Sequence, residues 1–153
     1  IIDASTDIYS GIVTGISFEI IDMETGKADR SPDSVNTDRM LNTIYTVEVT
    51  ESYKGEAVPV KKISIDGGLR GYNEKEQYDL MDVSGLLKKW PGIPVDVESP
   101  FLTIGSEYLF CTVHGTGDYD HIIQPDQFSY IFDSEGQIRS ETAKAIIKCA
   151  QNS

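Results

Sequence analysis

The residues with the clearest chemical potential lie in one segment, 114–121, with the sequence HGTGDYDH. It holds four possible metal ligands: His114, Asp118, Asp120 and His121. Imidazole nitrogens and carboxylate oxygens ligate Zn²⁺ and Ca²⁺, so the segment is a candidate metal site. The spacing matches no zinc motif, and a Gly-Asp β-turn flanked by histidines accounts for the same residues. The turn is the favoured interpretation.

Two further segments fall short of the sites that they resemble. The polar loop 22–40 contains acids that could collect Ca²⁺: Asp22, Glu24, Asp29, Asp33 and Asp38. Gly26 and Lys27 stand where an EF-hand needs a ligand and its glycine. The segment 67–71, GGLRG, lacks the Gly-Lys-Ser/Thr ending of a phosphate-binding loop. We therefore predict a solvated acidic loop and turn or bulge glycines.

The sequence contains no recognisable nucleophilic set, because it lacks a Gly-x-Ser-x-Gly elbow. Cys111 falls in a strand that is apolar on both faces, where a thiol packs rather than reacts. It could pair with Cys149 in a disulfide worth about 4 kcal/mol on the chain-entropy model, or both thiols could be buried separately. We predict a protein without catalytic residues and without a cofactor.

Alternating apolar residues predict the strands that would position these side chains. The first, 8–21, is interrupted by Gly11 and Gly15, which indicates bulges or sharp coiling. The segments 44–53 and 60–66 predict a hairpin with a tight turn at Lys54-Gly55. One face of the first strand is expected to be exposed to solvent. A buried central strand is expected at 107–113, and two short strands at 121–124 and 128–132 surround Pro125.

Two segments read as helices rather than strands. In the insertion 71–99, four apolar residues recur at roughly helical spacing: Leu80, Val83, Leu87 and Trp90. They predict a short helix or turn that packs over one end of the sheet. The segment 140–151 predicts a closing helix with Ser140 as its N-cap and one apolar stripe. All of this fits one domain over residues 1–153.

The composition narrows the classes of partner. The chain has 153 residues, 39% of them hydrophobic, which is enough for a core. Its formal net charge of −12 disfavours nucleic acids and anionic membrane surfaces, and it favours cations or cationic partners. The chain begins with Ile1 rather than Met, so we expect that a longer precursor was processed or trimmed.

Three segments, in this order, carry a resemblance to known proteins. They are Ala4–Gly15, the motif Tyr45-x-Val47-x-Val49-x-x-x-Tyr53-Lys54-Gly55, and the motif Leu102-x-x-Gly105-x-x-Tyr108-Leu109-Phe110. Together they resemble small exported or lipid-anchored bacterial domains without an assigned activity, similar to netrin modules and tissue inhibitors of metalloproteinases. The resemblance covers about residues 4–136. It implies an all-β, five- to six-stranded OB-like barrel with a C-terminal α-helix.

The resemblance also shapes the functional expectation. It implies an extracytoplasmic module, secreted or cell-surface anchored, that meets a membrane only through a lipid anchor. The metalloproteinase inhibitors chelate zinc with an N-terminal cysteine, whereas this chain begins with Ile1, so that mechanism does not carry over.

We expect a monomeric, non-enzymatic module that binds an unknown protein or carbohydrate. OB-type domains bind on one strand pair and its flanking loops, which points to four contact residues: Glu48, Thr50, Tyr72 and Tyr119. The alternatives are a protease-inhibitor-like module that uses another loop, and a Ca²⁺- or Zn²⁺-binding domain.

Overall fold

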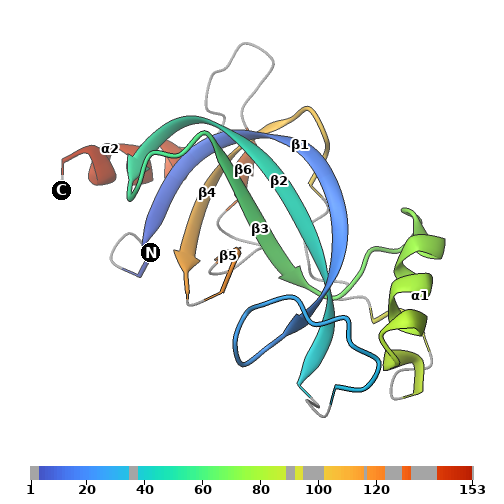
Figure 1. Ribbon diagram of the computed structural model, residues 1–153. Helices are drawn as coiled ribbons and strands as arrows, with labels where there is room; N and C mark the ends of the chain where they lie inside the picture. Colours follow the sequence, from blue (N-terminus) through green and yellow to red (C-terminus); the bar gives the residue numbers. More distant parts are fainter. Residues whose placement is uncertain are drawn as a thin grey trace.

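The structure is a computed structural model that describes residues 4–34, 38–88, 92–94, 102–115, 117–122, 129–131 and 141–152 (Figure 1). In chain order its elements are β1 (Asp7–Asp22), β2 (Arg39–Lys54), β3 (Val60–Asp66), α1 (Glu74–Val83), the 3₁₀ helix η1 (Leu86–Lys88), β4 (Glu107–His114), β5 (Asp120–Ile122), β6 (Ser129–Ile131) and α2 (Glu141–Gln151). The predicted β-rich fold with a C-terminal helix is confirmed. The predicted N-cap Ser140 and the side chain of Trp90 lie outside the described residues.

Five of the strands close a ring in the order β1-β2-β3-β5-β4, and β4 pairs back onto β1 (Figure 1). The pairs are antiparallel except β3 with β5, which meet in parallel at Ile63 and Asp120. Thr112 of β4 pairs with Asp7 of β1 and also with Ile122 of β5, so β5 lies on the β4 edge opposite β1. β6 follows β5 along that same edge.

Strand β1 serves both neighbours because it bends. Its pairing with β2 shifts register between Ser10 and Gly11 and again between Val13 and Gly15. A side chain at Gly11 would meet Val47 and would come within 2.8 Å of the Glu48 carbonyl oxygen. The predicted bulges are therefore present at both glycines, and at Gly11 only a residue without Cβ lets the two strands approach this closely.

The predicted hairpin is present with one correction. Tyr45 and Val47 are fully buried while Glu48 is exposed, as the alternation predicts. The tight turn is wrong, because residues 55–59 form a longer connection between β2 and β3. Gly55 begins that connection with φ 88°, and a side chain there would come within 2.7 Å of the Thr6 carbonyl oxygen. The loop therefore packs against the start of β1 instead of reversing within two residues.

Two apolar clusters hold the fold together. The first fills the ring, and the α2 residues Ile146, Ile147 and Ala150 pack against it, which confirms the predicted helix stripe. The second lies where β1 and β2 extend past the ring, between those strands and α1, and it contains Phe18, Leu41 and Met81. The fold therefore places α1 against the extended part of β1 and β2 (Figure 1), where it forms one wall of a groove.

Candidate functional site

Charged side chains converge at one end of the ring. Antiparallel pairing of β1 with β2 and of β2 with β3 makes β1 and β3 run in the same direction, and β5 runs parallel to β3. The first residues of these three strands therefore meet at one end, together with the last residue of the antiparallel strand β4. This topology brings together Asp7, Lys61, Asp120 and His114.

Asp120 is the centre of this polar cluster. Its side chain is only 3% exposed, and its Oδ2 lies 3.4 Å from Lys61 Nζ, which is also 3.2 Å from Asp7 Oδ1. The hydroxyls of Thr112 and Tyr9 donate to the same Oδ2 at 3.0 and 3.3 Å. Burial, together with the charge of Asp120, raises the pKa of the Tyr9 phenol well above its usual value, so Tyr9 acts here as a donor.

The predicted metal site is not assembled at this end of the ring. His114 Nδ1 does lie 2.7 Å from Asp120 Oδ1, and Asp118 lines the same hollow. His121 follows Asp120 directly in β5, so its side chain points to the opposite face of the strand. Among the residues that the structure describes, no three His, Cys, Asp or Glu side chains are grouped to hold a metal ion.

The Asp120 carboxylate finds its hydrogen-bonding and charged partners within the chain. The donors around Asp120 come from β1, β3 and β4, so the carboxylate ties three strands to β5. A buried carboxylate with this many donors is typical of a network that fixes a structure. His114 is the exposed member, because 53% of its side chain is accessible.

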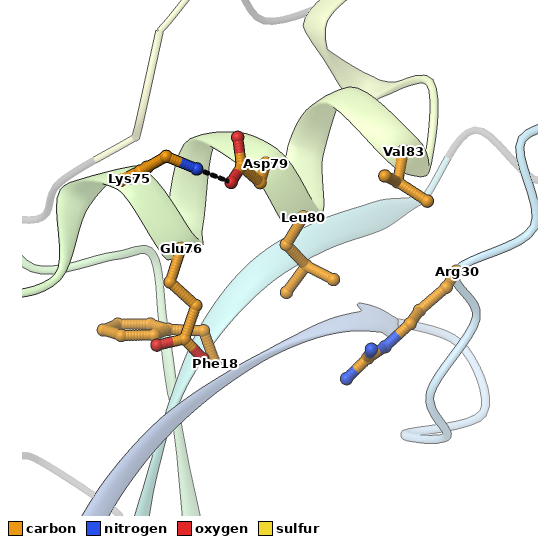
Figure 2. A pocket seen from close by; sticks show the side chains of 7 residues that line it. All are labelled: Phe18, Arg30, Lys75, Glu76, Asp79, Leu80 and Val83. Atoms are coloured by element: carbon orange, nitrogen blue, oxygen red, sulfur yellow. Dashed lines mark hydrogen bonds and ion pairs between the residues drawn. The ribbon is translucent and has the colours of Figure 1, made fainter.

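A second candidate site is a groove between α1 and β1, with a volume of about 460 Å³ (Figure 2). Its apolar surface comes from Phe18 of β1 and from Leu80 and Val83 of α1, and its charged rim comes from Arg30, Lys75, Glu76 and Asp79. Figure 2 shows Leu80 and Val83 pointing from the helix toward β1, with Arg30 reaching in from the loop after β1. We call this surface the α1–β1 groove.

Helical spacing explains why α1 presents this surface. Positions 76, 80 and 83 are separated by four and three residues, so Glu76, Leu80 and Val83 share one face. The neighbouring face carries Gln77 and Met81, which are both fully buried. The helix therefore anchors itself with one stripe and leaves the next stripe at the groove, where Val83 is 65% exposed.

The opposite wall is held by ion pairs and by a buried arginine. Arg30 donates to both carboxylate oxygens of Glu19, from Nε at 2.6 Å and from Nη2 at 2.8 Å. Arg39 is buried and donates to the carbonyl oxygens of Ser31 at 2.8 Å and Ser84 at 3.2 Å. Because Ser31 belongs to the loop after β1 and Ser84 caps α1, Arg39 fixes the two walls of the groove relative to each other.

The four predicted contact residues do not come together. Tyr72 is half-buried with its ring 6.4 Å from that of Phe18, next to the groove. Tyr119 is also half-buried, in a loop whose Asp118 N–H donates to the Gly26 carbonyl at 3.5 Å. Glu48 and Thr50 lie on β2 well beyond Thr43, the residue that pairs with Phe18. Thr50 donates to Glu107 at 2.6 Å, which occupies its hydroxyl.

Sequence reasoning missed most of the groove. Leu80 and Val83 were recognised by their helical spacing, but only as packing residues. Phe18 falls in the predicted strand 8–21, and nothing in its spacing shows that a helix leaves a groove beside it. The available signal was that acids, Glu76 and Asp79, stand four residues before the apolar Leu80 and Val83.

The predicted turn glycines of the segment 67–71 are confirmed, because Gly67 and Gly71 adopt φ of 88° and 79°. A side chain at Gly68 would collide with the Gln77 amide and would come within 2.7 Å of an Ile93 methyl group. The acidic loop is also organised internally: Asp29 accepts hydrogen bonds from the Ser31 N–H at 3.1 Å and from the Ser34 hydroxyl at 2.8 Å.

No protein-family model matches the sequence, and the search of curated proteins finds no significant match. The resemblance to netrin modules therefore stays a hypothesis. Within the described residues, no helix has the length and apolarity required to cross a bilayer.

The possible disulfide between Cys111 and Cys149 is absent. Cys111 is buried in β4 and Cys149 is exposed on α2, with no bond between them. Exposure of Cys149 also rules out two separately buried thiols. The sequence could not settle this point, because the position of the α2 stripe relative to the ring depends on tertiary packing.

The two thiols should react at different rates. Burial raises the pKa of the Cys111 thiol to about 11, and only a thiolate attacks an electrophile. We expect one thiol per chain to react with Ellman's reagent in the native protein and a second only after unfolding. Intact mass should be unchanged by a reductant. Two thiols that are both inaccessible before reduction would contradict the structure.

Proposed function

We propose that the chain is a non-enzymatic binding module and that the α1–β1 groove is its binding site. The observation that carries the proposal is the exposed side chain of Val83, which continues the apolar surface of Phe18 and Leu80 inside a charged rim. Concave apolar surfaces with a few charged groups are typical of ligand sites. Arg39 ties the loop after β1 to the end of α1, which favours a preformed site.

We further propose that the fold is OB-like and that the domain is exported, secreted or lipid-anchored. A Greek-key ring of five strands is the OB pattern, and the strand order supports it. The motif tyrosines have structural roles: the Tyr45 hydroxyl accepts a hydrogen bond from Leu102 N–H at 3.3 Å, and the Tyr108 hydroxyl accepts one from Thr103 N–H at 2.9 Å. These contacts support a resemblance in fold, because the motif tyrosines hold the structure together.

Substitution of Val83 tests the proposed site. We expect Val83→Asp to abolish retention of the partner when the immobilised protein is exposed to an extract of the source organism. The reason is that a carboxylate in the apolar floor loses its hydration when a partner covers it. Quantitative mass spectrometry of the retained proteins measures the effect.

Val60→Asp is the matched control. Val60 is also an exposed valine, on β3 at 52% exposure, and it lies outside the groove. It should leave the retained proteins unchanged. If both variants retain the same partner as the parent protein, the groove is not the binding site.

A further inference from the structure

We infer that the occupant of the α1–β1 groove is a basic amphipathic segment of another protein. This inference rests on the proposed function, because it names the partner of that same site. It is carried by the charge of α1 and its placement around the apolar stripe.

The apolar stripe favours a chain segment with its own apolar face. Leu80 and Val83 are one helical turn apart on α1, and the Phe18 ring lies beside Glu76, on the side of Leu80 away from Val83 (Figure 2). An elongated apolar strip of this kind suits side chains that recur at i, i+3 or i+4, as on an amphipathic helix. The charged rim on both sides suits polar residues that flank such a face.

The rim favours a positive partner. Helix α1 carries four acids, Glu74, Glu76, Asp79 and Asp82, against the single base Lys75. At the groove, Arg30 and Lys75 are each matched by a carboxylate, from Glu19 and from Asp79. Glu76 makes no ion pair within the described part of the chain, and its carboxylate adds negative charge to the rim beside the Phe18 ring (Figure 2).

The end of α1 gives an independent indication. Asp82 lies in the last turn of the helix, and that turn contains no basic residue. The C-terminal end of a helix dipole is negative, so an acid there is unfavourable and a cation is stabilising. A basic segment in the groove would supply that cation next to Val83. An acidic partner would instead meet Asp79 and Glu76, which both line the groove.

Direct binding of synthetic peptides tests the inference. Fluorescence anisotropy would compare three labelled peptides of equal length: an amphipathic Leu/Lys helix, an amphipathic Leu/Glu helix, and a scrambled Leu/Lys sequence without an apolar face. We expect only the amphipathic Leu/Lys peptide to bind, and its affinity should fall as salt is added. Equal or tighter binding of the acidic peptide overturns the inference, as does equal binding of the scrambled one.

Matched variants locate the binding. Glu76→Lys and Val83→Asp should each lower the affinity for the amphipathic Leu/Lys peptide by about tenfold. The first variant reverses a charge on the rim, and the second places a charge on the apolar surface of the groove. Val83→Asp adds an acid, so a gain in affinity from charge alone would show that the floor is not used.

Glu48→Lys is the control for Glu76→Lys, because it changes the net charge equally at an exposed site on β2. Equal weakening by both lysine variants would mean that the peptide senses only the overall charge, which overturns the inference. If no peptide binds while Val83→Asp still removes the partner from an extract, the proposed function holds and the basic segment is wrong.

Discussion

Replacement of Asp120 by alanine is expected to lower the free energy of unfolding by about 4 kcal/mol, which is typical of breaking a buried ion pair from one side. Among the residues that the structure describes, the substitution leaves Lys61 paired with Asp7 alone, and the Lys61 side chain is only 13% exposed. It also removes the acceptor of the Tyr9 and Thr112 hydroxyls, both of which are buried. Urea denaturation measures the loss.

Two variants separate this network from a general effect of charge. Asp118→Ala removes an exposed carboxylate in the preceding loop, and we expect a change within about 0.5 kcal/mol. Asp120→Asn keeps an acceptor oxygen and should be less damaging than Asp120→Ala. A small effect of Asp120→Ala, comparable with that of Asp118→Ala, would show that the polar cluster does not hold this end of the ring.

Replacement of Gln77 by leucine is expected to cost about 3 kcal/mol, because buried backbone groups lose their partners. The Gln77 amide donates to the carbonyl oxygens of Leu69 and Tyr72 at 2.9 and 2.7 Å, and its oxygen accepts from Leu69 N–H at 2.9 Å. Leucine fills a similar volume but satisfies none of these groups. The segment that leads into α1 should loosen, and the groove should lose one wall.

The neighbouring residue provides the control for this prediction. Tyr78 is 49% exposed on the other side of α1, so Tyr78→Ala should change the stability little. Hydrogen exchange of α1 amides would report the local effect. If Gln77→Leu leaves these amides as protected as in the parent protein, the hydrogen bonds of the Gln77 side chain do not hold α1 in place.

The strands could be predicted from sequence because each carries its own periodicity. The alternation around Tyr45 and Val47 needs no tertiary information, and Gly11 and Gly15 interrupt a pattern that is otherwise regular. The connection at 55–59 was predicted too short because its length depends on how Gly55 packs against Thr6, nearly fifty residues earlier. Such a contact leaves no local pattern.

The candidate site was harder because its residues come from separate elements. His114 and Asp120 are close in sequence and do meet, but β-strand alternation turns His121 away from them. Phe18, Arg30 and Val83 have no shared motif, and only the fold of α1 against β1 brings them together. The negative net charge of the chain could be read from the sequence, and it favours cationic partners.

The most direct test of the α1–β1 groove is a titration of the isotopically labelled protein with the amphipathic Leu/Lys peptide, followed by backbone amide NMR shifts. We expect the largest shifts at residues 76–83, at Phe18 and Glu19, and at Arg30. Shifts concentrated instead at Glu48, Thr50 and Lys62, with α1 unmoved, would place binding on the β2–β3 face and would contradict the assignment of the groove.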